Sequence, residues 1–117
     1  MSPRTHKRAS AGLRASAGVF AALGDETRLS LVSRLGRGGA LSIARLTEGQ
    51  RISRQAITKH LRVLRHAGLV RSVKRGRENC FELESRSLED ARRALVDISR
   101  LWDDALLRLK RAVEASR

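Results

Sequence analysis

Residues 52–83 read ISRQAITKHLRVLRHAGLVRSVKRGRENCFEL, a stretch in which basic and apolar side chains are interleaved and no acidic residue occurs before Glu78. Counted from Gly49, the acid-free segment holds nine basic residues: Arg51, Arg54, Lys59, Arg62, Arg65, Arg71, Lys74, Arg75 and Arg77. Apolar residues at positions 52, 57, 61, 63, 64, 69, 70 and 73 lie among them. A segment that carries core residues holds its charges in fixed positions, which recognition of a polyanion requires.

Residues 53–66 are predicted to form a helix with an apolar face and a basic face, and Ser53 is suited to cap its first turn. At 100° per residue, the apolar arc consists of Ala56, Ile57, Leu61, Val63 and Leu64, with His60 at the edge of the core. The opposite arc consists of Arg54, Gln55, Thr58, Lys59, Arg62, Arg65 and His66. Arg and Gln can make bidentate contacts with base edges, whereas a solvated face normally mixes both signs of charge. The pattern therefore favours contact with DNA.

Two helices are expected ahead of this region. The first begins at Ala17, and the second begins after Asp25, which is suited to cap it. The glycines of residues 36–39 are expected to end the second helix. Its buried side is predicted to consist of Leu29, Val32 and Leu35.

A short helix, a turn and a hairpin complete a winged helix-turn-helix. Ser42 is expected to begin the short helix IARLTE, and residues 49–52 form the turn that leads into the 53–66 helix. Gly68, in a left-handed conformation, would end that helix. The alternation in LVRSVKR and NCFELE, joined at Gly76, indicates a two-stranded hairpin. The fold class is therefore mainly α, with about five helices and a small β-hairpin as the wing.

The last segment is predicted to be a long helix, capped by Ser87 and ending near Ala115, with an apolar seam. The seam steps by three and four residues through Leu88, Ala91, Leu95, Ile98, Trp102, Ala105, Leu109 and Ala112. A seam of this length in so small a domain needs a partner helix, although part of it should pack within the subunit. The predicted dimer-interface residues are Phe20, Leu88, Leu95, Ile98, Trp102, Ala105 and Leu109.

Residues 17–114 resemble the ArsR/SmtB family of bacterial repressors, most specifically in the run TKHL…L…AGLV and in LGDETRLSLVSRL at 23–35. The resemblance implies a homodimeric repressor at a palindromic operator, dimeric through its terminal helices. It places the 53–66 helix in the major groove and the wing on flanking backbone or minor groove. Together with Arg65 from the basic arc, the DNA-binding residues are Ser53, Arg54, Gln55, Thr58, Lys59, Arg62, Arg65, Lys74, Arg75 and Arg77.

At 117 residues, the chain is long enough for one domain, which we assign to residues 17–115. Residues 1–16 are basic, carry little to bury, and are predicted to be a disordered arm. The formal net charge of +13 favours phosphate-rich partners. Because only 3% of the residues are aromatic, no stacking platform for single strands is expected, and double-stranded DNA is the favoured partner.

The residues predict neither an enzyme nor a metal, cofactor or membrane site. His6 lies in the arm, and His60 and His66 lie on opposite faces of one helix, so no catalytic spacing is present. The cysteine and histidine ligands of the family's metal sensors have no counterpart here. A membrane span would need a long apolar run, which the sequence lacks. The single cysteine, Cys80, fits a reducing cytoplasm.

Three alternatives to a sequence-specific repressor stay open, and one of them is a winged helix that binds a partner and does not touch DNA. The charge alone would suffice for a protein that coats DNA regardless of sequence. Cys80, in the second wing strand, could make a repressor redox-responsive, although a lone cysteine is more often a small strand residue. The sequence identifies no inducer and no operator.

Overall fold

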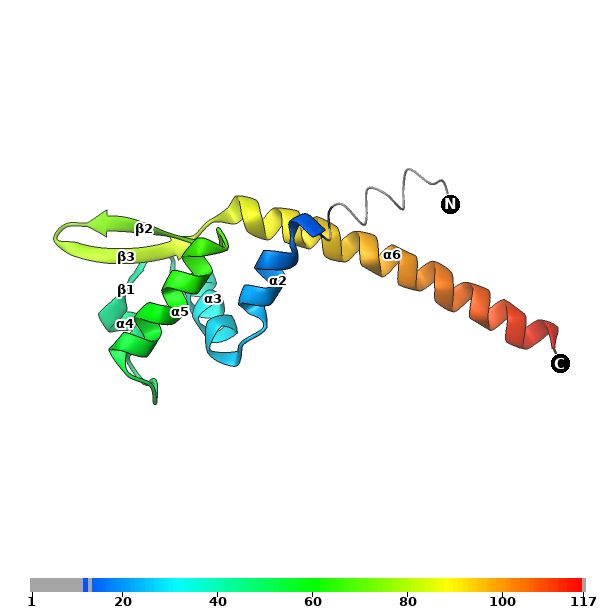
Figure 1. The fold of residues 1–117 in the computed structure, drawn as a ribbon, viewed down its shortest axis with the longest axis horizontal. Helices are drawn as coiled ribbons and strands as arrows, with labels where there is room; N and C mark the ends of the chain where they lie inside the picture. The colour runs from blue at the N-terminus through cyan, green and yellow to red at the C-terminus, as the bar shows by residue number, and fades with distance from the viewer. Residues whose placement is uncertain (1–11, 13, 117) are drawn as a thin grey trace.

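The computed structural model describes residue 12 and residues 14–116. Five helices and a three-stranded sheet follow one another in this part of the chain. Their order is α2 (Ala17–Leu23), α3 (Glu26–Gly38), β1 (Leu41–Ser42), α4 (Ile43–Thr47), α5 (Arg54–His66), β2 (Val70–Arg75), β3 (Glu78–Leu83) and α6 (Ser85–Ala115). The arrangement confirms the predicted winged helix-turn-helix, in which α4 and α5 form the two-helix unit and β2 and β3 form the wing (Figure 1).

The hydrophobic core lies where α3, α4 and α5 meet the sheet, and α2 closes one side of it. The largest side chains that are fully buried are Leu31, Leu46, Ile57, Leu61, Leu64 and Leu69. Three of these six belong to α5, so the rotation of α5 is set by its apolar side.

Side-chain caps fix where three helices begin, as the sequence predicted. The Ser53 hydroxyl accepts a hydrogen bond from the Ala56 amide at 3.1 Å, which starts α5. The Asp25 carboxylate accepts one from the Arg28 amide at 3.0 Å, and Ser42 caps α4 in the same way. Each cap satisfies a backbone donor that the first helical turn leaves free. The left-handed φ of +78° at Gly68 turns the chain out of α5.

The sheet has one strand more than predicted. Its order is β1-β3-β2, and β1 adds to the hairpin by pairing Leu41 with Phe81 and Ser42 with Cys80. Two residues are too few to show the alternation that identifies a strand in a sequence. The hairpin itself has the predicted turn at Gly76, where φ is +64°.

Three predictions about the helices are wrong. Val63 is 43% exposed because it lies about 120° around α5 from Ile57, which faces the core. Leu29 is 52% exposed, and Leu31, two residues further on, occupies the core in its place. α6 begins at Ser85 rather than after Ser87, and no side chain caps it. By contrast, α3 ends within the glycine run as predicted, because its last residue is Gly38 and its C-cap is Gly39.

The chain is elongated because α6 extends away from the body of the subunit, which consists of α2–α5 and the sheet (Figure 1). Its radius of gyration is 19.0 Å, whereas a compact domain of this length would have about 13 Å. Buried residues of α6 are confined to Ala91 and Ala94, and every residue from Trp102 to Ser116 is exposed. The described helices include none that is both long and apolar enough to cross a membrane.

Most of the predicted N-terminal arm lies outside the described residues. Ser16, which was assigned to the arm, is buried, and its amide donates a hydrogen bond to the Gly12 carbonyl at 3.0 Å. Within the described residues, the backbone therefore makes a helical hydrogen bond a few residues before α2.

Substitutions at two neighbouring residues of α5, one buried and one exposed, should differ in their effect on the free energy of unfolding. We expect Leu64→Ala to lower the free energy of unfolding by about 2–5 kcal/mol, because it opens a cavity in the core. Val63→Ala should change it by less than about 0.5 kcal/mol. Urea denaturation at equal protein concentration measures both, and equal losses would contradict this orientation of α5.

The Asp25 cap should make stability depend on pH in acid. The hydrogen bond from the Arg28 amide holds the pKa of the Asp25 carboxyl below its ordinary value. The stabilisation is therefore complete above the unfolded-state pKa, about 4, and is lost as the pH falls through the folded-state pKa. At neutral pH, Asp25→Ala should melt below the wild type, and this gap should shrink in acid. Asp25→Asn, which keeps an accepting cap, is the control. A difference in melting temperature between the wild type and Asp25→Ala that does not change with pH would contradict the role of Asp25 as the cap.

Candidate nucleic-acid interface

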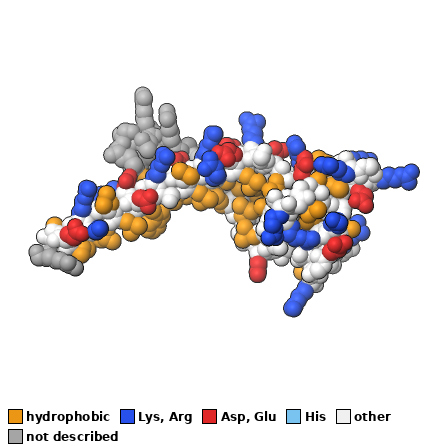
Figure 2. Space-filling model, turned by 180° about the vertical axis from the view of Figure 1, so that it is seen from behind, with side chains coloured by type: hydrophobic (Ala, Val, Ile, Leu, Met, Phe, Trp, Pro, Cys, Tyr) orange, Lys and Arg blue, Asp and Glu red, His pale blue; other side chains and the backbone are white. Residues whose placement is uncertain are grey.

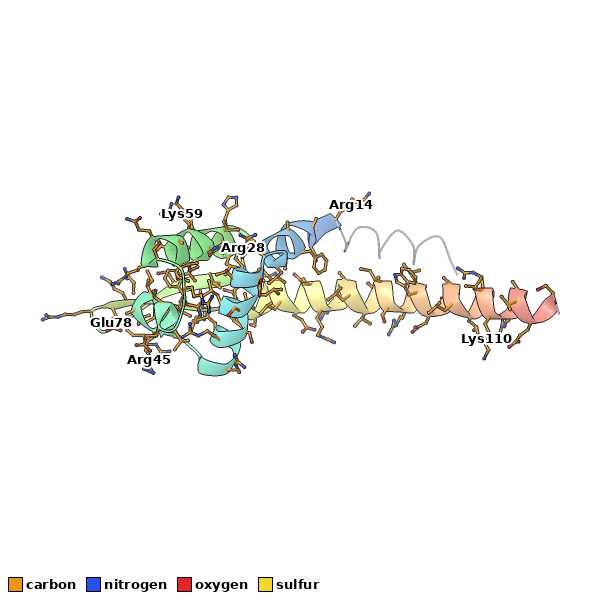
Figure 3. The ribbon with its side chains drawn as sticks, turned by 90° about the horizontal axis from the view of Figure 1, so that it is seen from below. Arg14, Arg28, Arg45, Lys59, Glu78 and Lys110 are labelled. Atoms are coloured by element: carbon orange, nitrogen blue, oxygen red, sulfur yellow. The ribbon has the colours of Figure 1, made fainter. Side chains whose placement is uncertain are left out.

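The outer face of α5 presents polar and basic side chains to solvent. Thr58 is half-buried, and its hydroxyl donates to the Arg54 carbonyl at 2.9 Å. Lys59 points away from the body (Figure 3). The exposed members of the face are Arg54, Gln55, Lys59, Arg62, Arg65 and His66. The structure thus brings the predicted α5 residues onto one surface, with Ser53 at its end as the cap.

The charges of the acid-free segment are almost all unpaired. Arg71 is the exception, because its guanidinium lies 2.7 Å from a Glu82 carboxylate oxygen and 3.6 Å from one of Glu84. The hydrogen bond to Glu82 raises the pKa of Arg71. Among the described residues, the other eight basic side chains of the segment have no carboxylate within 4.0 Å. They remain available to phosphates.

The wing adds a second group of cations beside the start of α5. Lys74, Arg75 and Arg77 are exposed at the tip of the β2–β3 hairpin. Arg77 and Arg54 line one cleft of about 280 Å³ between the wing and the beginnings of α4 and α5. Glu78 lines it too, so the cleft has both signs of charge. Helix and wing therefore form one continuous surface.

Two partly buried arginines donate hydrogen bonds to backbone carbonyls at the ends of helices, and sequence reasoning missed both. The Arg34 guanidinium donates to the carbonyl oxygens of Leu46 at 2.6 Å and Arg45 at 2.7 Å, at the end of α4. A cation there satisfies carbonyls that the last helical turn leaves free and opposes the helix dipole. No sequence signal distinguishes such an arginine from an exposed one, because the contact is made across the fold.

His60 lies at the edge of the core, as predicted, and contacts the second of these arginines. Its Nδ1 is 3.4 Å from Nη1 of Arg28 and 3.8 Å from an Asp25 carboxylate oxygen. Nε of Arg28 donates to the Ala22 carbonyl at 2.5 Å. This cluster ties the α2–α3 corner to the middle of α5.

The predicted dimer seam is divided between the body and the projecting part of α6. Leu88 and Phe20 pack against the subunit's own core, Ile98 is half-buried, and Ala105 is exposed. Beyond the body, the seam residues Leu95, Trp102 and Leu109 are 53%, 64% and 61% exposed. Figure 2 shows apolar side chains gathered along one edge of the projecting helix, with charged side chains along the other.

Cys80 does not offer an accessible thiol. It is 5% exposed and pairs in the sheet with Ser42 on one side and Val73 on the other. Oxidation requires an accessible thiolate. Its burial supports the interpretation of Cys80 as a small strand residue rather than a redox sensor.

Comparison with known proteins identifies the family. Residues 23–73, which span α3 to the first part of β2, match the family model described as a helix-turn-helix domain. Over 88 residues the chain is 34% identical to the HTH-type transcriptional regulator Rv2034 of Mycobacterium tuberculosis, covering 75% of this chain and 78% of that protein.

Solved structures agree with this match. An ArsR-like transcriptional regulator from Rhodococcus sp. RHA1 superposes with a TM-score of 0.71 at 41% identity, covering 85% of this chain and 92% of that one. The homodimeric winged helix-turn-helix domain of Mb0332 from Mycobacterium bovis has a TM-score of 0.60 over 89% of each chain; at 20% identity it supports the fold alone. From these similarities and the site described above, the chain belongs to the ArsR family of DNA-binding, winged helix-turn-helix transcriptional regulators.

Proposed function

We propose that this regulator is a homodimeric repressor that binds a palindromic operator in double-stranded DNA, in the cytoplasm. One observation carries the proposal above all: α5 and the wing present seven cations without a carboxylate partner among the described residues, all on an acid-free segment of folded chain. A protein that merely carried excess charge would not need to separate its acids from its bases in this way.

The α5 residues are suited to reading bases. An α-helix fits the major groove, where Arg and Gln can bind guanine and adenine through two hydrogen bonds each. Arg54, Gln55 and Arg62 have the side chains for such contacts, while Thr58 and Lys59 suit phosphates or single base atoms. The wing cations Lys74, Arg75 and Arg77 would lie on flanking phosphates or in the minor groove.

The exposed seam of α6 supports a two-fold dimer. The apolar side chains of Leu95, Trp102 and Leu109 stand at heptad spacing on a helix with no packing partner in the described part of the subunit. Mb0332, which shares the fold, is a homodimer. A two-fold axis through the terminal helices would place two α5 helices about 34 Å apart, one turn of DNA, over a palindromic site. Occupying such a site at a promoter would repress transcription.

Footprinting on the protein's own promoter, combined with substitutions in α5, tests operator binding. We expect a discrete, palindromic footprint, and Arg54→Ala or Arg62→Ala should each weaken operator binding by about 1–3 kcal/mol. Arg111→Ala, which removes the same charge from the polar side of α6, is the matched control and should have a smaller effect. Uniform protection of the DNA, with equal effects of all three changes, would instead support a protein that coats DNA regardless of sequence.

Substitutions on opposite sides of α6 test the dimer. Sedimentation should give the wild type a mass of about 26 kDa, twice the 13.0 kDa of one chain. Trp102→Glu should produce monomers, because it places a charge in the centre of the seam. Leu107→Glu alters a residue that is 47% exposed on the opposite side of the helix and should leave the dimer intact. A monomeric wild type, or dissociation by Leu107→Glu alone, would contradict dimerisation through this seam.

A further inference from the structure

Val63 is an exposed apolar residue on the cationic face of α5. Its side chain is 43% exposed, although it lies between Arg62 and the fully buried Leu64. With Lys59, Arg62 and His66 it lines a shallow hollow of about 510 Å³ on the surface of the helix. On this hollow, Val63 is therefore surrounded by the positive charges of Lys59 and Arg62 and by the imidazole ring of His66.

Neither packing nor helix stability accounts for a valine here. The core side of α5 is already filled by Ile57, Leu61 and Leu64, each at most 1% exposed. β-Branched residues are weaker helix formers than Ala, Arg or Lys, so an exposed position on a helix favours other side chains. The branched side chain does have one useful property: in a helix it keeps essentially a single χ1 rotamer, so its methyl groups are held in place.

The position of Val63 matches the row of side chains that would face the bases. Gln55, Lys59 and Val63 follow one another at four-residue steps, and each step turns by only about 40° around the helix. Val63 lies about 12 Å along the helix axis from Gln55. If the helix runs along the groove, this distance corresponds to about three to four base pairs.

The chemistry of the hollow identifies its occupant. The cations around Val63 attract a polyanion. The methyl groups of Val63 can then contact a small apolar group on that polyanion. In the major groove that apolar feature is the 5-methyl group of thymine. We propose that Val63 is a specificity-determining residue that contacts the methyl group of one thymine in each half-site. This inference rests on the proposed function, operator binding through α5.

Replacing thymine by deoxyuridine tests the contact, because it removes the methyl group and keeps every hydrogen bond of the base. With each thymine of the footprinted operator replaced in turn, wild-type affinity should fall at one position per half-site. The expected loss is about fourfold for one half-site and about 15-fold when both are replaced, from the burial of one methyl group. Val63→Ala should bind the unmodified operator with a comparable loss and should no longer respond to deoxyuridine at that position.

Controls separate this contact from general effects. Val63→Ala should fold normally, because Ala is the better helix former. Val96→Ala makes the same change at a 38% exposed position of α6 and should leave affinity for both DNAs unchanged. A discrete footprint without any sensitive thymine, or with unchanged sensitivity in Val63→Ala, would overturn the role of Val63 and leave operator binding standing. The absence of any preferred site would overturn both.

Discussion

The burial of one side of α5 is the constraint on which the rest of the molecule depends. Ile57, Leu61 and Leu64 lie against α3, the sheet and each other, and burying each contributes roughly 1.5–3 kcal/mol. Turning the helix by one residue would expose them and bury cations instead, so α5 has one available orientation. Every long polar side chain that points away from the core is thereby held at a known position. A cationic face becomes a specific surface only under such a restraint.

Arginine has two separate roles in this fold. Arg28 and Arg34 turn inward, where their guanidinium groups satisfy backbone carbonyls at the ends of α2 and α4. The arginines of α5 and the wing turn outward and, apart from Arg71, have no carboxylate partner within the described part of the chain. The first group links α3 to the ends of α2 and α4, two helices that pack against α5. Composition records a charge of +13 without distinguishing these roles, which depend on the distance from each guanidinium to a carbonyl or a carboxylate.

The parts of the fold that depend on local chemistry could be predicted from the sequence. Ser53, Asp25 and Ser42 cap helices as expected, and Gly68 and Gly76 turn the chain where predicted, because each acts on its own neighbours. The side of a helix that faces the core is harder to predict from the sequence. A helical wheel gives the angle between residues but not which angle faces the core, so it predicts the wrong side for Val63 and Leu29. The strand β1 is a product of tertiary pairing, and Arg34 is recognisable only beside the end of α4. The DNA-contacting residues remain predictions. So do the dimer residues, of which Leu95, Trp102 and Leu109 are exposed, whereas Phe20 and Leu88 pack against the subunit's own core.

Dimerisation through α6 would pair the DNA-binding surface of one subunit with the same surface of a second copy. Its apolar edge leaves the body and extends along the part of the helix that contacts nothing else in the described chain, so a second copy would fix the distance between the two α5 helices (Figures 1 and 2). The most direct test of this central claim is the affinity for operators whose half-sites are moved apart. Inserting about five base pairs, half a turn, should abolish tight binding by the dimer, because one α5 then faces the wrong side of the duplex. Unchanged affinity for the half-turn insertion would contradict the account.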